Sequence, residues 1–182
     1  MMVGMDAAAI PAGAGRTDLI RLEPWSEGDL DLLRRINAPE MTEFLGGPET
    51  DEQVEARHAR YVALDGTGRM FRIVALPEDE PTGTIGYWDR EWRGETVYET
   101  GWSVLPEFQG RGFAVAATVA VLDLARADGR NRYVHAYPKV AHASSNAICR
   151  KAGFTLLGEV DFEYPAGHPI RCNDWRFDLT GG

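Results

Sequence analysis

The chain has 182 residues, with 28 acidic side chains against 19 basic ones and a formal net charge of -9. This length fits one domain of ordinary size, and the 44% of apolar residues can supply its core. The acidic balance argues against a nucleic-acid partner, which requires clustered Lys and Arg, and no apolar run approaches the ~18 residues of a membrane span.

Cysteine and histidine spacing argues against a metal centre. The two cysteines, Cys149 and Cys172, form no CxxC pair, and the four histidines are scattered along the chain. We therefore expect no metal, no disulfide framework and a cytoplasmic location. Residues 1–17 are rich in Ala and Gly and lack the basic start and long apolar stretch of a signal peptide. We expect a flexible leader there and a single domain over residues 18–182.

The first third of the chain predicts one strand and two helices. The strand covers residues 18–22. The first helix is capped by Ser26, carries apolar residues at helical spacing and ends at residues 37–39. The second helix begins at residues 50–51 and runs towards Leu64, with a polar face that places it on the outside of the domain.

The middle of the chain has the pattern of a strand meander. Residues 70–76, 82–88 and 96–105 predict three strands, and the polar residues 89–95 predict the loop between the last two. Consecutive strands with short connections favour antiparallel pairing. Pro106 ends the third strand because it has no N–H to contribute to a ladder.

The last third alternates helices and strands. Residues 110–127 predict a long amphipathic helix, with Val115, Val119 and Leu122 on its buried stripe. The order of all elements indicates an α/β domain with a mixed sheet. The remaining elements are a strand, a short helix and a closing hairpin, at residues 133–137, 144–152, 154–164 and 170–179.

The turn before the long helix has the composition of a phosphate-binding loop. Its glycines let the backbone approach a ligand closely, and the first N–H groups of a helix have no intrahelical partner. Together with the helix dipole they can receive a pyrophosphate, and Arg111 adds a positive charge. The Gly-Lys-Ser/Thr sequence that ends a P-loop is absent. The spacing of Gly110 and Gly112 does not fit the glycine pattern of dinucleotide-binding proteins.

Two motifs resemble those of one known family. The sequence Gln-x-x-Gly-x-Ala at residues 109–114, preceded by Val-x-Pro, resembles the donor-binding motif of the GNAT superfamily of N-acetyltransferases. Residues 145–154, Ser-Asn-Ala-Ile-Cys-Arg-Lys-Ala-Gly-Phe, resemble the later helix of that family, in the branch with ribosomal-protein N-terminal and small-molecule acetyltransferases. The resemblance implies acetyl-CoA as donor and a three-layer α/β (α+β) fold, whose mixed, mostly antiparallel twisted sheet is flanked by helices.

The resemblance also implies which residues hold acetyl-CoA. Backbone N–H groups of the loop bind the pyrophosphate: Gln109, Gly110, Arg111, Gly112, Phe113 and Ala114. The main chain of the preceding strand pairs with the pantetheine arm: Trp102, Ser103, Val104 and Leu105. Polar residues of the later helix contact the far end of the donor: Ser145 and Asn146.

The catalytic residues follow from the chemistry of acetyl transfer. Glu99 matches the position of a general base in several family members, and the alternative is that it pairs with a nearby Arg. Cys149 occupies the place of a general acid, with plain packing as the favoured alternative and Tyr137 as another possible acid. His142 replaces an Asn common in this branch. It could contact the donor, act as a base or cap the loop, and the cap is the favoured interpretation.

The acceptor is expected between residues 36–47 and residues 163–171, where an aromatic and acidic cleft would suit a cationic amine. The resemblance implies a primary amine of a small molecule or of a peptide N-terminus, and a homodimer. Trp88 and Trp102 are assigned to the sheet core. The alternative function is an acyl-CoA sensor without turnover, whereas a dinucleotide-binding reductase is disfavoured by the glycine spacing.

Overall fold

A computed structural model describes residues 17–181, so the predicted leader lies outside the described residues except for Thr17. One mixed sheet organises this part of the chain. Every pairing between neighbouring strands is antiparallel except that between β4 and β5, which confirms the mostly antiparallel sheet. In sheet order the strands are β1 (Ile20–Pro24), β2 (Gly68–Ala75), β3 (Glu80–Trp92), β4 (Glu95–Val104), β5 (Tyr133–Ala136), β7 (Pro169–Asp178) and β6 (Thr155–Glu163).

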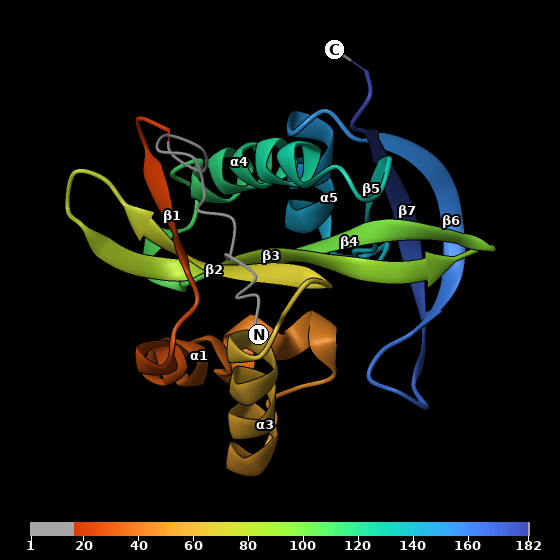
Figure 1. Ribbon diagram of the computed structural model, residues 1–182. Helices are drawn as coiled ribbons and strands as arrows, with labels where there is room; N and C mark the ends of the chain where they lie inside the picture. Colours follow the sequence, from red (N-terminus) through yellow and green to blue (C-terminus); the bar gives the residue numbers. More distant parts are fainter. Residues whose placement is uncertain (1–16, 182) are drawn as a thin grey trace, which may run out of the picture.

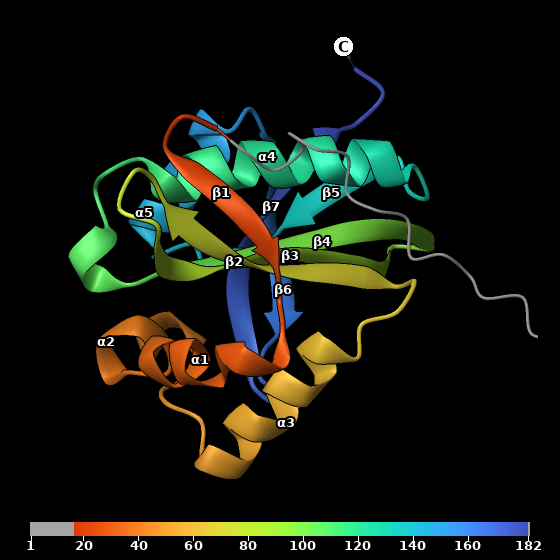
Figure 2. The ribbon, with the colours of Figure 1, turned by 60° about the vertical axis from the view of Figure 1, so that its left-hand side comes forward.

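Helices cover both faces of the sheet and give the three expected layers. On one face lie α4 (Phe113–Asp128) and α5 (Ala143–Lys151), and on the other lie α1 (Leu30–Ile36), α2 (Pro39–Thr42) and α3 (Asp51–Val62) (Figures 1 and 2). The β6–β7 hairpin extends beyond the helices at one end of the sheet. The face of β3, β4, β5 and β7 that points away from α4 and α5 therefore lies next to α1–α3 and to this hairpin.

The structure adds one element and corrects one predicted connection. Between the two predicted helices, Pro39 starts the short helix α2, and a 3-10 turn, Glu43–Leu45, follows it. The loop predicted over residues 89–95 is wrong. Strands β3 and β4 pair as far as Trp92 and Glu95, and Arg93 and Gly94 form a two-residue turn with φ of 52° and 82°. Polar residues of this stretch therefore belong to strands, and Arg90 among them pairs with Glu99 of β4.

The core lies mainly between the sheet and α4. Phe113, Ala117, Val121 and Leu124 form the buried stripe of this helix. Of the three residues predicted for this stripe, Leu122 is buried as expected and Val115 is half-buried, whereas Val119 has 42% of its surface exposed. The assignment of Trp88 and Trp102 is confirmed, because both pack against the core.

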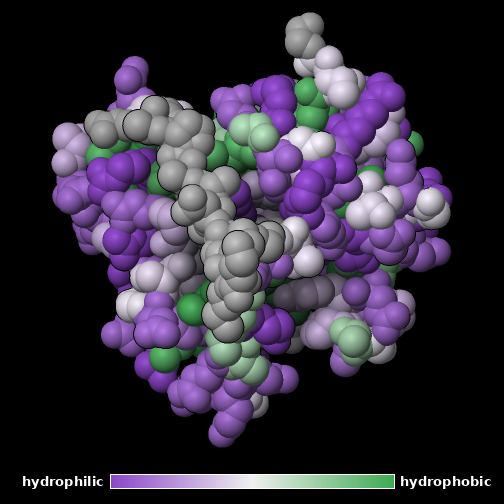
Figure 3. All heavy atoms as spheres, in the orientation of Figure 1, coloured by the Kyte–Doolittle hydropathy of each residue, from purple (hydrophilic) through white to green (hydrophobic). Residues whose placement is uncertain are grey.

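The surface agrees with an acidic, polar chain. On the face seen in Figure 3, hydrophilic residues predominate and hydrophobic ones form small separate patches. Within residues 17–181, no helix is long and apolar enough to cross a membrane.

Candidate active site

Strands β4 and β5 separate soon after they meet, and this opening is the centre of the candidate site. They pair only at Tyr98 with Val134 and at Glu99 with His135. Beyond that point β4 continues beside β3 as far as Val104, and no strand of residues 17–181 lies on its other side. The edge of β4 facing β5 can therefore accept an extended ligand as an added strand. The predicted pantetheine contacts at residues 102–105 lie along this opening or just past its end.

The glycine loop lies between the end of β4 and the start of α4. Gly110 and Gly112 have φ of 76° and 83°, a region that favours glycine because it has no Cβ. None of the backbone N–H groups of residues 110–115 donates a hydrogen bond to the described chain, and the first helical bond runs from Ala116 to Gly112. These N–H groups form a cradle for an anion at the N-terminus of α4. The residues present thus fit a bound pyrophosphate.

Two side chains fix and charge the loop. The Gln109 amide donates to the Val104 carbonyl oxygen at 2.9 Å, which holds the loop against the end of β4. Arg111 forms an exposed ion pair with Glu78 at 2.8 Å, and this hydrogen bond lowers the pKa of Glu78. Exposed pairs of this kind contribute little to stability, so a phosphate can replace Glu78 at low cost.

The two predicted residues of α5 have different surroundings. Ser145 lies near the surface, with its hydroxyl 3.4 Å from Nε2 of His142. Asn146 is buried, and its amide donates to the carbonyl oxygens of Lys139 and His142. Its Oδ1 accepts from Asn173 at 2.7 Å and Trp175 at 2.8 Å, so no hydrogen-bonding capacity remains for a ligand. Of these two residues, only Ser145 is free to contact the acetyl donor.

Glu99 is the last residue of β4 that pairs with β5, and one of its two carboxylate oxygens is already hydrogen-bonded. Its Oε2 lies 2.7 Å from Nη1 of Arg90 and 3.2 Å from Nε1 of Trp88, and its side chain is 16% exposed. The interpretation of Glu99 as a residue paired with a nearby Arg therefore describes what the structure contains.

An aromatic cage lies beside Glu99, and the chain's own cation fills it. The Arg90 guanidinium carbon is 4.4 Å from the ring centroid of Phe162, 5.4 Å from that of Tyr137 and 5.7 Å from that of Trp92. Stacked cation–π contacts of this kind are the ones that would bind a cationic ligand. The expected cage for a substrate amine is thus occupied by Arg90.

The other two predicted catalytic side chains do not face this centre. Cys149 is fully buried in the core, which agrees with the packing interpretation, and burial raises the pKa of its thiol to about 12. His142 precedes α5 as its N-cap residue, and its ring stacks on Phe44 with centroids 4.2 Å apart. Burial lowers the pKa of His142. This histidine joins the β5–α5 loop to the segment after α2.

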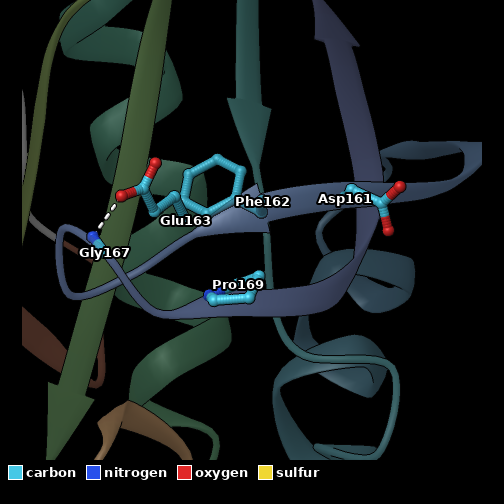
Figure 4. Close-up of a pocket in the computed structure, with 5 residues that line it drawn as sticks. All are labelled: Asp161, Phe162, Glu163, Gly167 and Pro169. Carbon is cyan, nitrogen blue, oxygen red and sulfur yellow. Dashed lines mark hydrogen bonds between the residues drawn. The ribbon is translucent and has the colours of Figure 1, made fainter.

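The two segments predicted to hold the acceptor lie side by side. A Cβ on Gly46 would lie 3.4 Å from Cδ of Pro165, so the turn after α2 touches the β6–β7 turn. The hairpin carries a hollow of about 450 Å³. Figure 4 shows Phe162 and Glu163 on one of its strands, with Glu163 accepting a hydrogen bond from the Gly167 N–H. Phe162 also packs under Arg90, so the hollow borders the aromatic cage.

The sequence did not single out Arg90, His135 or Asp174, which the fold brings to the same face. His135 and Asp174 lie 39 residues apart and form a hydrogen bond of 2.6 Å between Nδ1 and Oδ1. Alternation along β3 and β5 could have placed Arg90 and His135 on the face of Glu99, but no local pattern marks Asp174. Across residues 17–181 there is no group of three His, Cys, Asp or Glu that could hold a metal ion.

Comparisons with known proteins agree with this geometry. The family model described as acetyltransferase (GNAT) domain matches residues 20–155. No curated protein sequence matches the chain.

Solved structures share the fold over most of the chain. A GNAT-family acetyltransferase from Bacillus anthracis has 16% identity and a TM-score of 0.75, over 90% of this chain and 97% of that one. An acetyltransferase from Salmonella typhimurium that modifies the N-terminal serine of ribosomal protein L7/L12 has 20% identity and a TM-score of 0.75, over 89% and 96%. Spermidine N-acetyltransferase from Vibrio cholerae, in complex with CoA and spermine, has 16% identity and a TM-score of 0.73, over 90% and 98%.

Proposed function

We propose that this chain, which belongs to the acetyltransferase (GNAT) domain family, moves the acetyl group of acetyl-CoA to a primary amine. One observation carries the proposal: the opening between β4 and β5 leads to the unpaired N–H groups at the start of α4. The unpaired edge of β4 can bind the peptide-like arm of a ligand as an added strand. The N–H groups at the start of α4 can then bind a pyrophosphate that follows this arm.

The chain's own residues then have distinct roles. The loop of residues 109–114 binds phosphate through its backbone, and Arg111 exchanges Glu78 for a phosphate oxygen. The β4 edge from Thr100 to Val104 aligns the arm of the donor, and a backbone N–H of this edge polarises the thioester carbonyl. Acetyl-CoA supplies the activated acetyl group, and the opening brings it to the face of the sheet next to α1–α3.

The acceptor in this proposal is a primary amine of a small molecule or of a peptide N-terminus. The amine approaches through the space between residues 36–47 and the β6–β7 turn, which touch at Gly46 and Pro165. The similar structures include one named for a polyamine substrate and one named for a protein N-terminus. The chain works as a homodimer in the cytoplasm in this proposal, and light scattering of the purified protein tests the dimer.

Thiol release is the test of turnover. The full chain is incubated with acetyl-CoA and a panel of polyamines, amino acids, aminoglycosides and short peptides, and free CoA is measured with a thiol reagent. We expect release above background with one class of amine. Binding of acetyl-CoA without release from any class would favour an acyl-CoA sensor, and absence of binding would contradict both functions.

A further inference from the structure

A buried histidine–aspartate pair lies where β4 and β5 separate. Nδ1 of His135 is 2.6 Å from Oδ1 of Asp174, and Oδ2 of Asp174 accepts from Nε1 of Trp92 at 3.1 Å. The side chains of His135 and Asp174 are 5% and 1% exposed. Among residues 17–181, Asp174 has no Lys or Arg within ion-pair distance. A buried carboxylate is costly unless it is well hydrogen-bonded, and these two N–H donors fulfil that need.

The pair defines which nitrogen of His135 carries a proton. An ionised carboxylate only accepts hydrogen bonds, so Nδ1 of the neutral ring must be the protonated nitrogen. Nε2 then holds the lone pair, and it makes no hydrogen bond to the described chain. A carboxylate that orients a histidine in this way also stabilises the imidazolium that forms when Nε2 takes a proton.

His135 lies at the end of the opening between β4 and β5. It is the residue of β5 that faces Glu99 in the last pair before the strands separate. Side chains of paired residues lie on the same face of a sheet, so His135 shares the α1–α3 face with Glu99 and Arg90. This is the face on which the amine approaches in the proposed function.

The carboxylate of Glu99 is already engaged by neighbouring side chains in this arrangement. Its Oε2 already binds Arg90 and Trp88, and a carboxylate that takes a proton loses the charge that holds its guanidinium partner. Nε2 of His135 makes no such competing hydrogen bond within residues 17–181.

We propose that His135 is the general base of the acetyl transfer and that Asp174 is its positioning residue. The inference rests on the proposed function. The amine nitrogen forms a bond to the acetyl carbon while its proton passes to Nε2 of His135. The bond between that carbon and the CoA sulfur breaks with its electron pair on sulfur, and the imidazolium returns the proton to this thiolate. The products are the N-acetyl amine and free CoA.

Other ionisable groups face His135 from the neighbouring parts of the sheet. These groups are Arg90 on β3, Glu99 on β4, Tyr137 directly after β5, and Asp174 and Arg176 on β7. A protonated imidazole cannot accept a proton from the amine, so the rate is expected to fall as the pH is lowered.

Kinetics of two variants test the roles. We expect His135→Gln to lower kcat by about 10²- to 10⁴-fold and to remove the acid limb of the pH profile, with unchanged affinity for acetyl-CoA. Asp174→Asn keeps an acceptor for Trp92 but presents an N–H to Nδ1, which forces the proton onto Nε2. It should lower kcat much more than it changes KM. Wild-type kcat and an unchanged acid limb in His135→Gln would overturn the inference, while turnover by the wild-type chain would still support the proposed function.

A spectroscopic measurement keeps the inference testable if a variant does not fold or no acceptor is found. In wild-type protein with ¹⁵N-labelled histidine, we expect Nδ1 of His135 protonated and Nε2 unprotonated at pH 7.5. Adding CoA should shift the Nε2 resonance of His135 and leave that of His58, on α3, in place. The opposite tautomer, or no shift at saturating CoA, would overturn the role of His135. Failure of the wild-type chain to bind CoA would instead contradict the proposed function.

Discussion

The donor loop and the acceptor face are built in different ways. The loop of residues 109–114 is continuous in sequence and acts through backbone N–H groups, which glycines leave accessible. The acceptor face is assembled from side chains of several strands. Four of these side chains, from four different strands, are Arg90, Glu99, His135 and Asp174. The difference teaches that a local motif can identify the donor, whereas the chemistry at the acceptor depends on the completed sheet.

The largest effect is expected from breaking the donor loop while keeping its helix. Gly112 and Gly129 end α4 at its two termini, both with positive φ. Valine at either position costs about 1–2 kcal/mol of backbone strain. Only Gly112→Val blocks the cradle, and the loss of two charge-assisted hydrogen bonds should weaken CoA binding by about 100-fold.

Calorimetric titration with CoA and a thermal melt separate these effects. Gly129→Val is the matched control, with a similar loss of melting temperature and wild-type affinity. Equal affinities for the two variants would show that the loop does not bind the donor.

A smaller effect is expected from substitutions of Asn146 and Ser145, which are adjacent on α5. Asn146→Leu leaves the side-chain N–H groups of Asn173 and Trp175 without their acceptor, so the free energy of unfolding should fall by about 2–4 kcal/mol. Ser145→Ala removes no buried hydrogen bond and should leave stability unchanged while weakening CoA binding a few-fold. Denaturant titration and calorimetry on both variants check the pair. The reverse pattern would restore Asn146 as a donor contact.

The fold was readable from the sequence where patterns are local. The two helix caps at Ser26 and Thr50 and the stop at Gly153 follow from side-chain and glycine chemistry. The β3–β4 hairpin was misjudged because its polar residues continue the two strands, with Arg90 facing the site while Glu91 and Glu95 are exposed to solvent. Alternation cannot distinguish a buried ion pair from a solvated one, since both require charged residues at the same positions.

Only part of the catalytic centre could be predicted from the sequence, because some of its residues are far apart in the chain. Glu99 lies next to the donor motif in the sequence and was identified with it. Asp174 is paired to His135 by the closing β7 strand, and only the order of strands in the sheet brings them together. Cys149 was placed by analogy, and the structure buries it.

A smaller effect is expected from Glu99→Gln on the acceptor face. Because His135 is the base in our account, kcat should fall by less than about 10-fold and the acid limb should remain. Arg90 loses a charged partner that is partly exposed, so stability should fall by about 1 kcal/mol. A pH–rate profile and a denaturant titration measure both. Loss of the acid limb in this variant would transfer the role of base from His135 to Glu99.

The smallest effect concerns His142, whose ring stacks on Phe44 and joins the β5–α5 loop to the segment after α2. Burial lowers its pKa in the folded protein, so the unfolded chain binds this proton more readily. Stability is thus fully present above the ordinary pKa of 6.5 and decreases as the pH falls below it, towards the lower folded pKa. His142→Phe keeps the stacking and should lose less melting temperature between pH 7.5 and pH 5.5 than the wild type. His168→Gln, at an exposed position, is the control and should behave like the wild type.

The most direct test of the donor site is calorimetric titration of the full chain with acetyl-CoA, with acetyl-pantetheine and NADH as comparison ligands. Acetyl-pantetheine lacks the pyrophosphate, and NADH carries a pyrophosphate without the pantetheine arm. Our account predicts binding of acetyl-CoA, at least about 100-fold weaker binding of acetyl-pantetheine and no binding of NADH. Equal affinity for acetyl-CoA and acetyl-pantetheine, or no binding of acetyl-CoA, would contradict the assignment of the opening and its glycine loop as the donor site.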